Sequence, residues 1–225
     1  MICVYLQAKF AVFRTFSSGT FRPTAGFLTP SAAYGLLLNF AGIEMRLNDG
    51  KSEMTLIQKD LPKVKLALGA LSFPQRHSVF QQLHNYPIGN SGKEHAPKTK
   101  GSKYNIFPAR REFLSDVKAY ICTDENVELE KKIIEGIQGK QKRMYGLPFL
   151  GDNNFLIDRF DLVEEKEPAF WFEKIGQDRE EFFDNATRLT ISINRSNLSK
   201  TTSALFAPTP KKQLEIPVSA WVKIP

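Results

Sequence analysis

The chain has 225 residues, and 31 Lys and Arg against 24 Asp and Glu give it a formal net charge of +7. Hydrophobic residues make up 42%, which excludes a disordered chain, and two cysteines exclude a disulfide-rich scaffold. The length allows one large domain or two small ones. The longest uncharged stretch, residues 23–43, is too rich in Pro, Gly and polar residues for a membrane span.

The cysteines and the N-terminus bear on location. Cys3 and Cys122 fit a reducing compartment, and their wide separation offers no pair of metal ligands. Lys9 interrupts the apolar block that a signal peptide would need. We expect a soluble, cytoplasmic protein that has no membrane contact.

The charge is unevenly distributed. Residues 1–111 carry 15 basic and 5 acidic side chains (+10), residues 112–186 carry 10 and 18 (−8), and residues 187–225 carry 6 and 1 (+5). This division indicates one surface that faces a polyanion and an acidic middle that faces away from it. Ordinary solvated charge remains the alternative.

The first unit reads as a strand, a polar loop and a helix. Apolar residues alternate from Ile2 to Phe13, which predicts a strand. A loop of Ser, Gly, Thr and Pro follows over 14–29, and Thr29-Pro30 supplies a helix N-cap and a proline at the first helical position. Gly42 is placed to stop the helix.

The second unit repeats this order after a long basic insertion. One strand is predicted over 64–71, before the insertion. Strands over 111–122 and 155–163 follow the insertion, and between them lies a helix that has Asp124 or Asn126 as its cap and Gly139 at its end. This order predicts an α+β fold with a split βαβ, or ferredoxin-like (RRM/RAMP), domain over residues 1–163. Strands expected over 170–175, 187–194 and 218–224 would form a C-terminal antiparallel β extension, residues 164–225.

Catalytic and metal-binding patterns are weak. Glu94 stands where a phosphate loop needs Ser or Thr, and no Gly-x-Ser-x-Gly elbow occurs. The three histidines lack a spacing that signals zinc. We therefore expect no catalytic residues, no metal and no cofactor.

Two segments of the sequence contain residues that are suited to binding RNA. The segment from His84 to Arg111 has a net charge of +5 and interleaves cations with rings, so it can bind phosphates and stack on unpaired bases. The polar loop carries hydroxyls and two arginines near a helix N-terminus, a ready phosphate site. For Thr29 and Ser31, simple helix capping is an equal alternative.

These residues carry a resemblance. The stretch over 21–37, FRPTAGFLTPSAAYGLL, resembles the N-terminal signature of the Cas-five family, the RAMP-type subunits of type I CRISPR surveillance complexes (Cascade). The stretch over 147–151, LPFLG, resembles that family's Leu-Gly loop, and the basic segment over about 84–111 resembles its thumb. The sequence as a whole is most similar to the DevS branch of type I-B-like systems.

The resemblance implies a scaffold role. Such a subunit caps the 5′ handle of the CRISPR RNA, contacts the backbone subunit and the large subunit, and lies near the motif that flanks the target DNA. The implied RNA-binding residues of the loop and helix are Arg14, Thr15, Arg22, Thr24, Thr29, Ser31 and Tyr34. Those of the thumb are His84, Tyr86, Lys93, Lys98, Lys100, Lys103, Tyr104, Arg110 and Arg111.

Two alternatives stay open. One branch of the family cleaves precursor RNA without metal, and His95 with Lys93 and Tyr104 could supply a general base and a cation. However, Glu94 separates Lys93 from His95, whereas the cleaving branch has an adjacent Lys-His pair. The third possibility is a stand-alone RRM-like RNA-binding protein, for which the expected pair of aromatic residues on the sheet is not evident.

Overall fold

The first helix forms where the sequence predicts it. The computed structural model describes residues 1–15, 20–51, 55–87, 104–143, 146–176 and 184–224, and only the backbone of 83–87 and 104–107. Helix α1 (Pro30–Phe40) begins at Thr29, whose side chain accepts a hydrogen bond from the Ala32 N–H. Gly42 follows the helix with a φ of 70°, a left-handed conformation that favours glycine.

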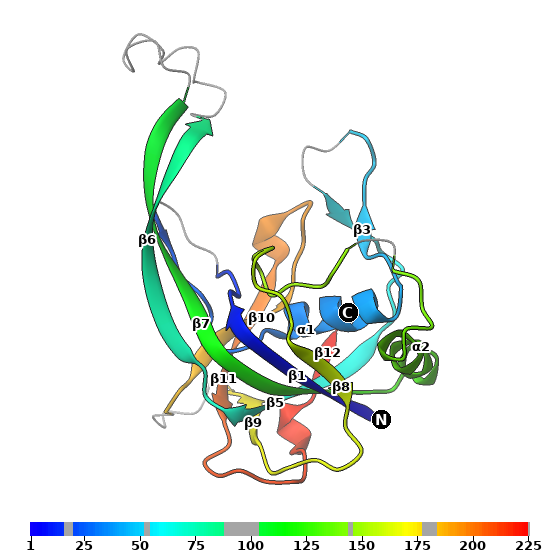
Figure 1. Ribbon diagram of the computed structural model, residues 1–225. Coiled ribbons are helices and arrows are strands. Elements are labelled where there is room, and N and C mark those ends of the chain that lie inside the picture. Colours follow the sequence, from blue (N-terminus) through cyan, green and yellow to red (C-terminus); the bar gives the residue numbers. More distant parts are fainter. Residues whose placement is uncertain (16–19, 52–54, 88–103, 144–145, 177–183, 225) are drawn as a thin grey trace.

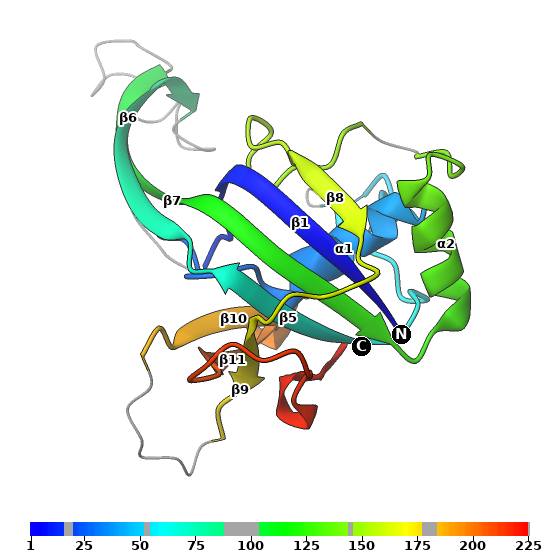
Figure 2. The same cartoon turned by 60° about the horizontal axis from the view of Figure 1, so that its bottom comes forward.

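Four antiparallel strands and two helices form the centre of the fold (Figures 1 and 2). The strands are β1 (Ile2–Ala11), β5 (Val64–Ser72), β7 (Tyr104–Asp124) and β8 (Arg159–Leu162), and the second helix is α2 (Val127–Ile137). Their spatial order is β5-β7-β1-β8. In chain order this is second, third, first and fourth, with a helix in each half. The predicted α+β, ferredoxin-like fold is confirmed.

The C-terminal strands extend the same sheet. Strands β9 (Phe170–Lys174), β11 (Thr202–Pro208) and β10 (Thr187–Ser192) continue it beyond β5, and β12 (Val222–Ile224) also pairs with β5. The single strand expected over 218–224 is instead a 3-10 turn (Val218–Ala220) followed by the three residues of β12. A second 3-10 turn spans Leu198–Lys200, and the short strands β3 (Arg46–Leu47) and β4 (Leu56–Ile57) pair with each other. The domain boundary at residue 163 stays a prediction.

Helix α1 lies between the sheet and its C-terminal extension. Seven of its 11 residues are buried, among them Leu37 and Leu38 with no exposed surface. The extension reaches this core through Phe172 of β9, which stacks on Phe27 at a centroid distance of 4.4 Å. Because each buried leucine contributes about 1.5–3 kcal/mol, this packing fixes the position of the polar loop that leads into α1.

The basic insertion is a long hairpin. Strand β6 (Gln75–Pro87) pairs antiparallel with the outer half of β7, and the hairpin projects from the sheet (Figure 1). The sequence prediction was wrong about its lower part: the strand expected from Arg111 begins at Tyr104, and residues 75–83 pair with it. Residues 75–80 are all exposed, so they show none of the alternation by which a half-buried strand is recognised.

The two cysteines correct a second prediction. Cys3 of β1 and Cys122 of β7 are direct register partners and form a disulfide, although 119 residues separate them in the sequence. Separation along the chain is therefore no guide to their distance, and the expectation of a reducing compartment loses its basis. Cytoplasmic location stays a prediction. Among the described residues, no helix is long and apolar enough to cross a membrane.

Reduction of this disulfide should destabilise the protein. A crosslink that closes a loop of this length restricts the unfolded chain, and such bonds typically stabilise by about 2–4 kcal/mol. We expect the midpoint of urea unfolding to fall when dithiothreitol is added, with no change in a Cys3→Ala/Cys122→Ala variant. Titration of two free thiols in the unreduced, native protein would contradict the bond.

Gly136 sets the contact between the helices. A Cβ at this position would overlap the backbone carbonyl group of Phe40 at the end of α1, which cannot move aside as the end of a flexible side chain could. We expect Gly136→Ala to lower the free energy of unfolding by about 1–3 kcal/mol, although alanine favours helices by about 1 kcal/mol over glycine. The control is Gly146→Ala, where an added Cβ meets no atom within 4 Å. Equal urea midpoints for both variants would refute this close packing.

Candidate nucleic-acid interface

The two segments predicted to bind RNA meet at the base of the hairpin. Strand β2 (Phe21–Arg22) of the polar loop pairs in parallel with β7, Phe21 beside Arg110 and Arg22 beside Arg111. The Arg110 N–H also donates to the Thr20 carbonyl at 2.9 Å. A stretch near residue 20 and a stretch near residue 110 therefore lie side by side, and we call their arginines the arginine interface: Arg14, Arg22, Arg110 and Arg111. Because side chains alternate along β7, Arg110 projects from the face opposite to that of Arg111 and Arg22.

Buried hydrogen bonds close the polar loop at Thr24. Its hydroxyl accepts from the Phe13 N–H at 2.9 Å and donates to the Ala25 carbonyl at 3.2 Å. The Ala25 N–H returns to the Phe13 carbonyl at 2.8 Å, and the Thr24 N–H donates to the Glu112 carboxylate at 3.2 Å. These bonds hold the two ends of the loop together, so Arg14 and Arg22 leave it at fixed positions.

Three of the four arginines are available to bind an anion. Arg14 and Arg110 are exposed and Arg22 is half-buried. None of them forms an ion pair with an acidic residue of the described segments. Arg110 is oriented by its Nε, which donates to the Ser78 hydroxyl at 2.7 Å. Guanidinium groups in this state can bind phosphate oxygens through charge-assisted hydrogen bonds.

Arg111 is half-buried and is held by side-chain partners. Its guanidinium lies 2.8 Å from the Asp152 carboxylate and 3.1 Å from the Gln81 side-chain oxygen. Donation from the Asn154 N–H lowers the pKa of the Asp152 carboxyl, and the charges of Arg111 and Arg14 act in the same direction. The ion pair therefore persists at neutral pH and ties the loop around Asp152 to the hairpin, so Arg111 has a positioning role.

The predicted residues at the start of α1 separate into a different group. Thr29 is buried as the helix cap, and its hydroxyl lies 3.1 Å from that of Ser31. Tyr34 is buried, its hydroxyl donates to the Pro62 carbonyl at 2.6 Å, and burial raises its pKa to about 12. Like Thr24, these side chains have structural partners, and we leave them out of the interface. Thr15 is half-buried beside Arg14.

The remaining predicted residues lie at the described ends of β6 and β7 or outside the described residues. His84, Tyr86 and Tyr104 belong to β6 and β7 by their backbone, and their side chains lie outside the description. Lys93, His95, Lys98, Lys100 and Lys103 lie outside the described residues altogether. Their roles stay predictions.

Sequence reasoning missed several partners of the arginines. Ser78, Gln81 and Asp152 orient Arg110 or Arg111, yet each is a common polar residue without a recognisable motif. The one signal near Asp152 is Gly151, with a φ of 81° and the Val12 backbone against the place of a Cβ. The LPFLG stretch contains this glycine, so the motif marks where the loop docks on the end of β1.

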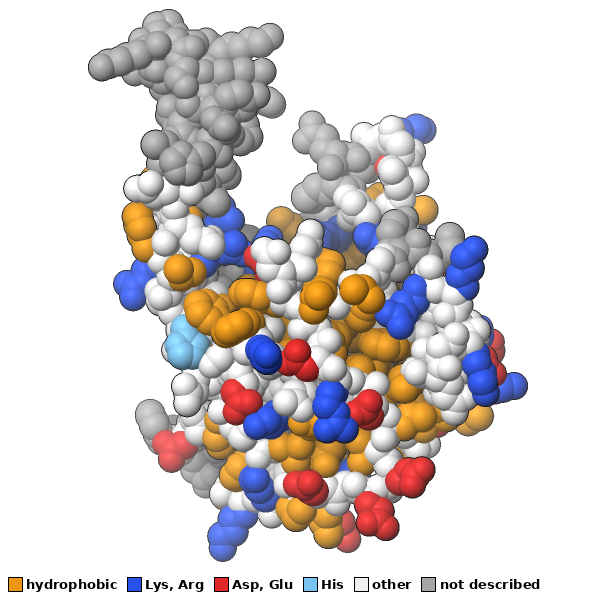
Figure 3. Space-filling view, in the orientation of Figure 1, with side chains coloured by type: hydrophobic (Ala, Val, Ile, Leu, Met, Phe, Trp, Pro, Cys, Tyr) orange, Lys and Arg blue, Asp and Glu red, His pale blue; other side chains and the backbone are white. Residues whose placement is uncertain are grey.

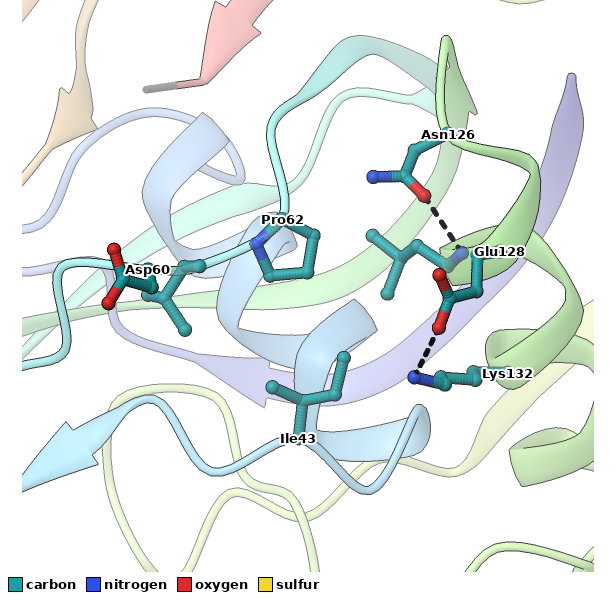
Figure 4. A pocket seen from close by; sticks show the side chains of 8 residues that line it. Ile43, Asp60, Pro62, Asn126, Glu128 and Lys132 are labelled. Carbon is teal, nitrogen blue, oxygen red and sulfur yellow. Dashed lines mark hydrogen bonds and ion pairs between the residues drawn. The ribbon is translucent and has the colours of Figure 1, made fainter.

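The other described features of the surface offer little chemistry. No group of three or more metal-ligating side chains occurs within the described segments. A shallow pocket of about 260 Å³ lies between α2 and the segment before β5 (Figure 4). Its lining includes an exposed ion pair of 2.8 Å between Glu128 and Lys132, as well as the helix cap Asn126. These are ordinary partners of a helix start.

In the space-filling view, basic and hydrophobic side chains lie at the base of the hairpin, and acidic side chains lie mainly over the lower part of the molecule, where basic ones also occur (Figure 3). Helix α2 lies on the side away from the hairpin (Figure 1). A surface of this kind can bind the phosphates of a nucleic acid strand.

Comparison with known proteins shows a likeness of fold to solved structures. No family model matches the chain, and no curated protein matches it. A chain of a solved structure, a CRISPR RNA-guided surveillance complex, aligns over 97% of this chain and 92% of its own with a TM-score of 0.58 and 12% identity. The protein thus shares its fold, over nearly its whole length, with a chain of a CRISPR RNA-guided surveillance complex.

Proposed function

We propose that this protein is an RNA-binding subunit of a type I CRISPR surveillance complex of the Cascade type, and that it holds the 5′ handle of the CRISPR RNA. The observation that carries the proposal is the pairing of β2 with β7, which places Arg14, Arg22 and Arg110 at the base of a projecting hairpin. The shared fold and the resemblance of residues 21–37 to the Cas-five family support the same function.

In this role the arginine interface binds backbone phosphates. The buried bonds of Thr24 fix the backbone from which Arg14 and Arg22 project, and the Ser78 hydroxyl orients Arg110 before RNA arrives, so less conformational entropy is lost on binding. Phosphate contacts of this kind set position and carry no sequence information. Sequence specificity of the complex then comes from pairing between the guide and its target.

The proposal includes partners and excludes catalysis. The hairpin would reach along the guide, and other faces would contact the backbone subunit and the large subunit near the flanking motif of the target DNA. The complex would serve antiviral defence or RNA-guided transposition. We propose that the subunit does not cleave RNA, since Glu94 interrupts the Lys-His pair of the cleaving branch.

Replacing the available arginines should weaken RNA binding and its dependence on salt. The slope of log K against log salt is negative, and removing one phosphate interaction with a single strand reduces its magnitude by about 0.7. The triple variant Arg14→Gln/Arg22→Gln/Arg110→Gln should therefore reduce the magnitude by about 2. Filter binding or fluorescence anisotropy of single-stranded repeat RNA at several salt concentrations measures this slope.

The control changes the same amount of charge elsewhere. Lys174 in β9 and Lys211 and Lys212 after β11 are exposed, and these segments lie at the end of the molecule opposite the hairpin (Figure 1). Their triple replacement by Gln should leave the slope within experimental error. If both triple variants lowered the slope equally, binding would reflect net charge and the arginine interface would be rejected.

Absence of catalysis has its own test. The full chain, incubated with its cognate repeat RNA in EDTA, should leave the RNA intact, because a scaffold subunit needs no general base. The measurement is a denaturing gel of end-labelled RNA. Metal-independent cleavage that a His95→Ala change removes would establish the endoribonuclease alternative and overturn the non-catalytic assignment.

A further inference from the structure

Four rings form a cluster at the base of the hairpin, next to the arginine interface. Phe10 of β1 lies edge-on to Phe113 of β7 at a centroid distance of 5.6 Å, and Phe155 lies 5.7 Å from Phe10 and 6.1 Å from Phe113. His77 of β6 stacks on Phe113 at 5.2 Å. We call these four residues the ring cluster.

The ring cluster is turned away from the core. Phe10 is 43% exposed, whereas its neighbours Ala8 and Ala11 are buried in the core, so the alternation of β1 breaks at this point. On β7 the break coincides with Asp116, whose φ is 55°. Beyond it Leu114 enters the core and Phe113 does not. A large apolar side chain exposed by a break in two adjacent strands is unlike the isolated exposed residues of an ordinary surface.

Specific contacts hold the rings in place. The His77 Nε2 lies 2.7 Å from the Ser115 hydroxyl, which fixes the imidazole over Phe113 while His77 remains exposed. The loop that bears Phe155 closes through the Leu150 N–H, which donates to the Phe155 carbonyl at 2.8 Å. The Val12 N–H donates to the Leu150 carbonyl at 2.9 Å, so this loop is anchored to the end of β1.

The ring cluster is continuous with the arginine interface. Arg111 and Phe113 are two residues apart on β7, so their side chains project from the same face of the strand. The Arg111 guanidinium binds Asp152, and the carbonyl of Asp152 accepts from the Phe155 N–H at 2.9 Å. In the space-filling view, hydrophobic side chains lie directly below the basic ones at the base of the hairpin (Figure 3).

We infer that the ring cluster is a stacking platform for unpaired bases of the RNA strand whose phosphates contact the arginine interface. This inference rests on the proposed function and adds the part of the RNA that binds here. A single RNA strand carries a planar base beside each phosphate, and this surface likewise has aromatic rings beside arginines. Proteins that hold single strands combine these two elements, and stacking tolerates any base.

Two kinds of exposed ring supply the platform. The exposed imidazole of His77 covers Phe113 on one side and presents its other face outward. Phe10 lies on the neighbouring strand with its ring tilted by 76° to that of Phe113. Because the rings are not parallel, the arrangement receives bases that are splayed apart more readily than a continuous stack.

The experiment compares protein variants with RNAs that lack a base. The probe is single-stranded cognate repeat RNA, intact or with one abasic residue scanned through the handle, bound to the full chain. Loss of one stacked base should weaken binding to the wild type about 5- to 100-fold at the position that meets the platform. The variants are Phe10→Leu and His77→Gln, which keep an apolar or a polar exposed side chain.

In each variant, intact RNA should bind more weakly by a similar factor, and the abasic residue should add little further loss. The salt slope should not change, because every phosphate interaction is retained. The control is Phe73→Leu, an exposed ring that stacks on Phe170 at 4.8 Å outside the ring cluster, and it should bind as wild type does. Equal melting temperatures confirm that the variants fold.

The outcomes separate this inference from the proposed function. If the triple arginine variant weakens binding but Phe10→Leu and His77→Gln do not, the platform is rejected while the proposed function stands. If the arginine variant binds normally, both fail. If the ring variants bind RNA normally but lose association with a purified partner subunit, the cluster is a protein interface and the inference is overturned.

Discussion

Backbone pairing along β7 holds together every part of the structure that bears on RNA binding. This strand of 21 residues pairs with β1 and β5 in its inner half and with β6 and β2 in its outer half. Its hydrogen bonds therefore connect the buried sheet to the exposed hairpin within a single strand. A flexible linker at the foot of the hairpin would let the arginines move relative to the core, and the continuous ladder prevents this.

Packing around α1 makes the inner half of β7 a rigid support. Ile121, Ala119 and Val117 of that half are fully buried in the core with the leucines of α1. The polar loop enters α1 directly, so its exit is fixed by the same core that fixes β7. Both sides of the arginine interface thus rest on one hydrophobic cluster, although they are nearly 90 residues apart in the chain.

Charge at the interface is used in two ways. Arg111 is neutralised by Asp152 and joins the Gly151 loop to the hairpin, while Arg76 lies 3.8 Å from Glu112. Arg14, Arg22 and Arg110 have no such partner within the described segments and supply the positive field. An arginine paired with a carboxylate contributes position, and one without such a partner contributes affinity for phosphate, so residues of the same type have different roles at one site.

Periodic and capping signals in the sequence were sufficient to predict β1, β5, α1 with its Thr29 cap, α2 with either Asp124 or Asn126 as its cap, and hence the ferredoxin-like order; the structure has Asn126 as the cap of α2. The same reading identified the arginines of both segments. The folded structure was needed to show that Arg22 lies beside Arg111, that Cys3 meets Cys122, and that Phe10 and Phe113 form a pair outside the core. Local patterns report which face of an element is buried, whereas register between distant strands, and a break such as that at Asp116, is set by the whole sheet.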